Sequence, residues 1–340
     1  MTTRLLNLFC GSQRGRVLGI NTAAVYTGLS SGPFLGGLIT QNLNWRGIFY
    51  INALIGIILI VINTIYLKHE WQELEDYKYD YRGAAVYILS IILLMTSVSF
   101  FPEPVGYLLL AVSVFSFVML YSIESKTEHP IFNINLFRSN KTFTMSNTAA
   151  LINYSATFAI SFLMSFYLQS VKMLNPEDAG IILITQPVIQ ALFSPISGRL
   201  SDKTEPGYVA SAGMGLLTIG LIIFCFLAKN TSYVLIVANL AMMGLGFALF
   251  SSPNVNAIMS SVEKKYYGVA SSTLASMRMI GQMFSMGIVI IIFSIFIGSE
   301  KISAANQDAF LTSLQTAFVL FSVLCFLGIF ASLSRGKLKR

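Results

Sequence analysis

The sequence predicts an all-α, polytopic membrane protein with about ten transmembrane helices, and two properties of the chain support this fold class. First, 55% of its 340 residues are hydrophobic and only 11% are charged, whereas a typical water-soluble domain is about 25% charged. Second, ten runs of at least twenty residues contain no Asp, Glu, Lys or Arg, and roughly 20 apolar residues suffice to cross a hydrocarbon core. These properties exclude a globular enzyme and a receptor with a single span.

Each run is expected to form a helix, because backbone amides in lipid must be hydrogen-bonded within their own segment or in a closed barrel. The alternation of polar and apolar residues that is typical of membrane barrels is absent from the runs. Two longer polar loops are expected at 68–81 and 123–141, the second with an amphipathic stretch on the membrane surface. The predicted helices cover residues 17–39, 46–67, 82–101, 104–122, 143–169, 179–198, 208–228, 232–252, 269–297 and 310–333.

The basic residues lie mainly on one side of this topology, which predicts its orientation. Four basic residues fall in one set of alternate gaps between the runs, namely Arg46, Lys172, Lys229 and Lys301. Seventeen fall in the other set, namely Arg4, Arg14, Arg16, Lys68, Lys78, Arg82, Lys126, Arg138, Lys141, Arg199, Lys203, Lys264, Lys265, Arg335, Lys337, Lys339 and Arg340. Because positively charged loops stay in the cytoplasm, both termini are expected there, in a multi-pass protein of the cell (inner) membrane. This alternation accounts for the net charge of +7 without a nucleic-acid partner.

No pattern of catalytic or metal-ligating residues is present, so the chain is not expected to be an enzyme or to hold a cofactor or a metal. The three cysteines, Cys10, Cys225 and Cys325, are scattered among apolar residues and are expected to pack as small side chains. The two histidines, His69 and His129, lie in predicted cytoplasmic loops without partner ligands. A membrane enzyme would need clustered His, Asp or Glu near one membrane face.

The first predicted helix carries a glycine motif with a regular spacing. Gly28, Gly32 and Gly36 are four residues apart and share one face of a helix, where small residues allow a second helix to approach closely. Pro33 removes a backbone hydrogen bond and is expected to bend the helix. The complete motif comprises Gly19, Gly28, Gly32, Pro33, Gly36 and Gly37.

This motif resembles the antiporter motif in the fifth helix of the major facilitator superfamily, and the next segment resembles one branch of that family. Residues 44–52, NWRGIFYIN, are similar to the start of the sixth helix in the fourteen-helix drug:proton antiporters, the QacA and EmrB-like branch. Asp80 and Gly83 resemble the opening of that branch's extra central helix pair. The resemblance covers nearly all of the chain and implies a partial major-facilitator fold that lacks the first four helices.

On this resemblance the chain divides into three parts. Residues 1–67 are expected to be a remnant of the N-terminal half with family helices five and six, 68–141 the central helix pair with flanking cytoplasmic loops, and 142–340 the C-terminal half with six helices. All fifteen acidic residues lie outside or at the margins of the predicted helices. In the family the proton-coupling acids lie in the early helices, so this chain alone is not expected to form a proton-coupled cavity.

A second motif, Gly198, Arg199, Asp202 and Lys203, resembles the second copy of the family's cytoplasmic loop motif. Asp202 is expected to accept hydrogen bonds from the N-terminus of a neighbouring helix or to pair with a base, so that the loop holds the cytoplasmic face closed in one transport state. The sequence departs from the family pattern after Lys203, where 204–207 replace the usual basic continuation. A capped helix end with a solvated turn is the alternative interpretation.

One charged residue, Arg278, lies inside a predicted span, where charge is costly and indicates a functional site. It is expected either to gate or polarise a cavity or to pair with helix carbonyls. The polar residues inside the spans either line a substrate cavity or form hydrogen bonds between helices. The candidate cavity or gate residues are Asn147, Asn153, Tyr154, Gln186, Gln190, Asn239, Arg278 and Gln282.

The resemblance implies a transporter that exports drugs or other amphiphilic small molecules against proton entry by alternating access. Its expected partners are the lipid bilayer, a small-molecule substrate and protons. The alternative is a truncated, non-transporting remnant, or a subunit that requires a separately encoded piece with four helices.

Overall fold

A computed structural model of the protein describes residues 46–66, 80–101, 103–127, 134–298 and 307–336, together with the single positions 20, 24, 28, 35, 36, 39 and 44. Within these residues nine helical segments are long and apolar enough to cross a membrane. They correspond to the last nine predicted helices. The first predicted helix, 17–39, and Gly19, Gly32, Pro33 and Gly37 of its motif lie outside the described residues, apart from the single positions given above.

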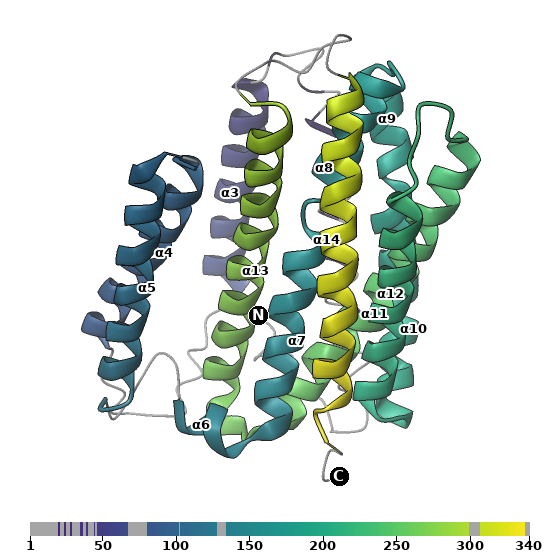
Figure 1. Ribbon diagram of the computed structural model, residues 1–340. Coiled ribbons are helices and arrows are strands. Elements are labelled where there is room, and N and C mark those ends of the chain that lie inside the picture. Colours follow the sequence, from purple (N-terminus) through teal and green to yellow (C-terminus); the bar gives the residue numbers. More distant parts are fainter. Residues whose placement is uncertain are drawn as a thin grey trace.

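The fold consists of helices that run alternately up and down (Figure 1). The α-helices are α3 (Arg46–Tyr66), α4 (Tyr81–Ser99), α5 (Pro104–Glu124), α6 (Ile134–Ser139), α7 (Lys141–Thr157), α8 (Ile160–Phe166), α9 (Pro176–Leu183), α10 (Thr185–Lys203), α11 (Pro206–Phe224), α12 (Tyr233–Ser260), α13 (Tyr267–Phe296) and α14 (Gln307–Leu333). A π-helix, η2 (Tyr167–Val171), follows α8, and a 3₁₀ turn, η3 (Lys264–Tyr266), precedes α13. We call the end at which α7, α11 and α13 begin and α14 finishes the basic end, because most of the described Lys and Arg residues lie there.

Short polar side chains and prolines set the helix starts. The oxygen of Asp80 accepts a hydrogen bond from the Gly83 N–H at 2.8 Å, and that of Asn140 accepts one from Phe143 at 2.9 Å. Such caps satisfy the first N–H groups of a helix. Proline occupies the first turn of α5, α9 and α11, where its missing N–H costs nothing.

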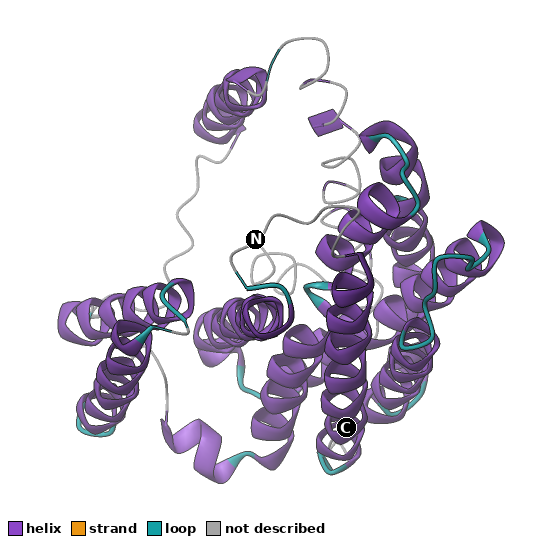
Figure 2. Ribbon diagram, turned by 45° about the horizontal axis from the view of Figure 1, so that its top comes forward, coloured by secondary structure: helices purple, strands orange, loops and turns teal. Residues whose placement is uncertain are grey.

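Helices α7 to α14 form a bundle in which α14 packs on α7 and α11, α12 packs on α10 and α11, and α13 packs on α7 (Figures 1 and 2). The hairpin of α4 and α5 lies beside α13, which it meets through a hydrogen bond of 2.9 Å from the Tyr87 hydroxyl to Ser276 Oγ. Helix α3 lies apart, and Gly47 is its single buried residue.

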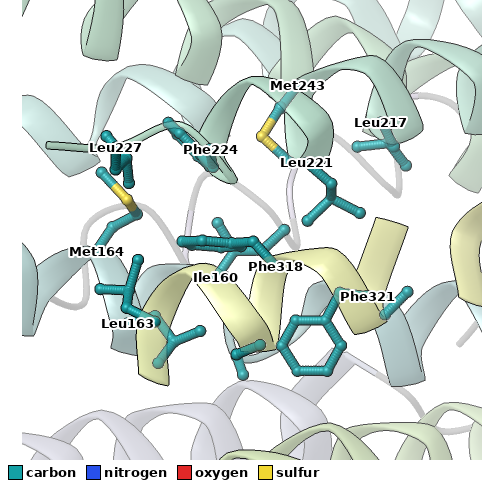
Figure 3. Packing of buried hydrophobic residues seen from close by; sticks show 14 of the residues in the cluster. Ile160, Leu163, Met164, Leu217, Leu221, Phe224, Leu227, Met243, Phe318 and Phe321 are labelled. Carbon is teal, nitrogen blue, oxygen red and sulfur yellow. The ribbon is translucent and has the colours of Figure 1, made fainter. Parts of the chain in front are cut away.

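The bundle core lies between α8, α11, α12 and α14 (Figure 3). Phe224 and Phe318 pack with ring centroids 5.2 Å apart, and Ile160, Leu221 and Met243 surround them. Lipid tails are as apolar as these side chains, so close van der Waals packing stabilises the contact more than removal from water does.

Three predicted helices differ from the observed ones, and one of them, predicted over 179–198, is divided at Ile184 into α9 and α10. The helix predicted over 232–252 is longer in the structure, because α12 continues through Pro253 to Ser260. Proline inside a membrane helix is tolerated when neighbouring groups satisfy the freed carbonyl. The single helix predicted over 143–169 is interrupted at Phe158–Ala159 and divides into α7, α8 and η2.

Candidate functional site

A close crossing of α7 and α13 brings three of the predicted site residues together. An ideal Cβ atom on Gly281 would lie 2.7 Å from the Leu151 carbonyl oxygen and 2.9 Å from Tyr154 Cβ. No side chain fits at this contact, so the helix backbones approach as closely as small residues permit. Tyr154 of α7 therefore lies beside the turn of α13 that carries Arg278 and Gln282.

Arg278 lies near the middle of its span. It is eleven residues after Tyr267, the first residue of α13, which is about 16 Å along a helix axis at 1.5 Å per residue. Its side chain is exposed within the described chain. A charged group facing hydrocarbon at this depth is costly. This face of α13 must therefore contact water or further protein.

The interruption between α7 and α8 lies against the same helix. The Ala159 N–H donates a hydrogen bond of 3.0 Å to Ser285 Oγ of α13, and Ser285 is fully buried. The serine thus satisfies a backbone group that the interrupted helix leaves free. Non-helical backbone at membrane depth is typical of segments that line a binding site. Sequence reasoning missed Ser285; its position four residues after Gly281, on the same helix face, was the available signal.

The three predicted asparagines have different environments. Asn239 Nδ2 donates to the Gly220 carbonyl of α11 at 2.9 Å, which is a hydrogen bond between helices. Asn147 Nδ2 donates to the Phe143 carbonyl of its own helix at 2.9 Å. Asn153 is fully buried, and neither atom of its amide has a hydrogen-bond partner among the described residues.

The two predicted glutamines of α10 face α12. The backbone of Gln186 contacts Gly244, and Gln190 Nε2 donates to Ser251 Oγ at the long distance of 3.5 Å. Buried polar residues follow Gln190 along the same helix face, namely Ser194, Ser197 and Ser201. Their spacing of three or four residues gives α10 a polar stripe that ends next to Asp202.

The loop motif is fixed to α12 at the basic end. Asn256, which is buried, donates from Nδ2 to Ser201 Oγ at 3.0 Å and to Asp202 Oδ1 at 3.4 Å. Gly198 is buried, whereas Arg199 and Lys203 are exposed. The structure therefore ties Asp202 to a neighbouring helix through an amide, a partner that the sequence pattern did not indicate.

The remaining features are separate from these residues. Gly28 and Gly36 of the glycine motif are helical, and no described atom lies within 4 Å of their ideal Cβ positions. A pocket of about 470 Å³ opens at the basic end between the start of α7 and the end of α12, where Asn140, Lys141 and Glu263 line it. It contains none of the predicted cavity residues.

Comparison with known proteins identifies relatives over most of the chain. The sequence model of the Major Facilitator Superfamily matches residues 1–171 and 146–338. The chain is 30% identical to the riboflavin transporter RibZ of Clostridioides difficile, over 95% of the chain and 70% of that protein. It is 25% identical to the multidrug resistance protein Stp of Mycobacterium tuberculosis and 28% identical to the multidrug transporter protein MdtP of Bacillus subtilis, over 81% and 82% of the chain. The chain spans 52% of the length of each of these two proteins.

Proposed function

The chain belongs to the major facilitator superfamily, and from this premise we propose that it acts in the proton-coupled efflux of drugs or other amphiphilic small molecules by alternating access. The nine apolar helices of the described residues and the family make the chain an integral membrane protein. Membership of this family of transporters makes it a membrane transporter. The names of its relatives, a riboflavin transporter and multidrug resistance proteins, support small organic molecules as the substrate class.

The observation that carries the proposal is the exposed Arg278 at mid-span, with Tyr154 beside it on α7. An aromatic residue, an amide and a guanidinium at one helix crossing suit a substrate with apolar and polar parts. The guanidinium also needs an anionic counterpart, which in a proton-coupled antiporter is a carboxylate that releases it on protonation. No acidic residue lies within the core of the described spans, so this carboxylate is proposed to come from helices that pack on this face.

The orientation belongs to the same proposal. Because basic loops remain in the cytoplasm, the basic end is proposed to face the cytoplasm of the cell (inner) membrane, with both termini on that side. On this assignment the Asp202–Asn256 contact belongs to the cytoplasmic gate and Arg278 lies above it in the cavity.

A second proposal concerns what completes the transporter. The exposed charge of Arg278 and the separation of α3 from the bundle favour a chain whose cavity is closed by further helices. These helices are supplied either in the same polypeptide or by a separate piece of about four helices. An affinity tag at residue 340 tests whether the further helices form a separate protein. A small membrane protein that copurifies with this chain in equal amount supports a separate piece.

The transport proposal is tested in everted membrane vesicles that contain the chain together with the further helices that close its cavity. We expect ethidium to accumulate when a proton gradient is imposed and to leave when nigericin collapses the gradient. Arg278→Gln is expected to abolish accumulation, whereas Arg82→Gln, which removes an exposed arginine from the basic end, preserves it. Riboflavin in place of ethidium distinguishes a flavin transporter. Accumulation that is equal in wild type, Arg278→Gln and vesicles without the protein contradicts the proposal.

A further inference from the structure

A buried arginine lies at the basic end, just after α14. Arg335 follows the last residue of α14 by two positions, and its side chain is 2% exposed. The guanidinium nitrogens Nε, Nη1 and Nη2 are all buried and have no hydrogen-bond partner among the described residues. Buried cations in proteins are normally paired, because an unpaired charge away from water is strongly destabilising.

The first turns of two helices hold Arg335 in this place. Thr142 Oγ1, at the start of α7, donates to the Arg335 carbonyl at 2.9 Å. An ideal Cβ atom on Gly207, at the start of α11, would lie 3.9 Å from Arg335 Cδ. A hydrogen bond of 2.8 Å between Ser211 Oγ and Ser332 Oγ joins α11 to α14 one turn away. The Arg335 backbone is therefore held against α7, and its side chain lies next to α11.

The electrostatic surroundings favour a negative ligand. Helix N-termini carry partial positive charge, and α7 and α11 both begin beside Arg335. Burial lowers the pKa of Arg335 to about 9. The group remains protonated at neutral pH, so the positive charge persists together with two helix N-termini. No carboxylate of the described chain forms a hydrogen bond with the Arg335 guanidinium. A planar guanidinium can form two parallel hydrogen bonds with a phosphate group.

The surface around this junction fits a phospholipid. The outward face of α14 remains apolar to its end, with Phe326, Phe330 and Leu333 exposed. Tyr208 of α11 is 63% exposed at the same level, and tyrosine is enriched where a bilayer meets water. Four of the last six residues are basic, namely Arg335, Lys337, Lys339 and Arg340, and such clusters beside a transmembrane helix attract anionic lipids.

We propose that Arg335 anchors a phosphate-binding site at the junction of α7, α11 and α14, and that an anionic phospholipid headgroup occupies it. The flexible arginine stem carries the guanidinium outward to the headgroup by side-chain rotation, as long basic side chains do at bilayer interfaces. The acyl chains then lie along α14 beside Phe330. The site is independent of the transported substrate.

Native mass spectrometry of the purified chain tests the lipid. We expect wild type to retain phosphatidylglycerol in preference to phosphatidylcholine, and Arg335→Gln to lose roughly tenfold or more in affinity, the equivalent of one charge-assisted hydrogen bond. Arg199→Gln is the matched control, because Arg199 is an exposed arginine at the same end, and it is expected to retain the lipid. Equal retention by wild type and Arg335→Gln overturns the proposal.

Thermal unfolding of the wild-type chain tests the same site without requiring that any variant folds. Phosphatidylglycerol is expected to raise Tm more than phosphatidylcholine does. If inorganic phosphate raises Tm instead and Arg335→Lys weakens that effect, the phosphate site is supported and its occupant is the free anion. If neither phosphatidylglycerol nor inorganic phosphate raises Tm, the site does not exist.

Discussion

At the scale of single residues, Asn256 determines how the loop motif is held. Its amide lies 3.4 Å from Asp202 Oδ1, so Asn256→Asp would place a second carboxylate beside the first. Two carboxylates at this distance cannot both be ionised without a large cost, and one takes up a proton. We therefore expect Asn256→Asp to lower Tm relative to wild type at pH 8 and much less at pH 5, where protonation removes the repulsion. Thermal unfolding at both values measures the difference.

Ser260→Ala is the control for this prediction, because Ser260 donates to Asn256 Oδ1 at 3.2 Å and carries no charge. Its small effect on Tm should be the same at both pH values. A Tm difference for Asn256→Asp that does not depend on pH would show that the aspartates are not in contact.

Arg335 gives a second prediction at this scale. Its pKa without a ligand is about 9, and a bound phosphate raises the pKa because it stabilises the charged form. The affinity for phosphatidylglycerol is therefore expected to be constant below pH 8 and to fall between pH 9 and pH 10, as the free arginine loses its proton. Lys141 on α7 and Glu205 on α11 are the charged groups at the two helix starts packed against it. Lipid retention measured over this pH range in Arg335→Gln should be low and flat.

At the scale of elements, the crossing of α11 and α12 depends on two glycines. An ideal Cβ atom on Gly213 would lie 2.6 Å from the Gly246 carbonyl oxygen and 2.7 Å from the Phe250 nitrogen. Both are backbone atoms, which cannot move without separating the helices. We expect Gly213→Ala to destabilise the bundle by about 1–3 kcal/mol, the usual cost of overpacking. Unfolding in a denaturing detergent measures this loss of stability.

Gly215 supplies the matched control on the same helix, because no atom lies within 4 Å of its ideal Cβ position. Gly215→Ala is expected to be neutral or to stabilise the helix by a few tenths of a kcal/mol up to about 1 kcal/mol. Similar losses of stability in Gly213→Ala and Gly215→Ala would contradict the close contact at Gly213.

The interruption between α7 and α8 gives another prediction for an element. Ser285→Ala removes the acceptor of the Ala159 N–H, and an unpartnered buried N–H costs about 1–3 kcal/mol. Faster hydrogen exchange is therefore expected around 158–163. Ser272→Ala, at an exposed position of α13, should leave that exchange unchanged. Unaltered exchange in Ser285→Ala would mean that the interruption is stable without the serine.

Composition and charge were enough to predict the helices of the described chain, because a run of twenty uncharged residues has few alternatives to a membrane span. The end of α12 could not be predicted in this way, since Pro253 terminates helices in water and is retained in a membrane bundle. Asp202 was predicted from a local motif. Its partner Asn256 lies 54 residues away, and no local pattern joins them. Arg335 was counted among the basic loop residues, and only the packing of three helices shows that it is buried.

At the scale of the whole molecule, the proposed transport mechanism requires a water-lined face on α13. On the proposed transport mechanism the face around Arg278 lines the cavity, whereas the outward face of α14 contacts lipid. Both faces are exposed within the described chain, so exposure alone does not distinguish them. Accessibility to a charged reagent distinguishes the two faces.

The most direct test is therefore the labelling of Ala275→Cys and Val319→Cys by a membrane-impermeant thiol reagent, in a chain whose native cysteines are replaced. Ala275 lies one turn from Arg278, which stays in place, and Val319 lies in the middle of α14 on its outward face. The account predicts that the reagent labels residue 275 and leaves residue 319 unlabelled. If both cysteines remain unlabelled, the face around Arg278 is sealed or faces lipid, and the proposed transport cavity is contradicted.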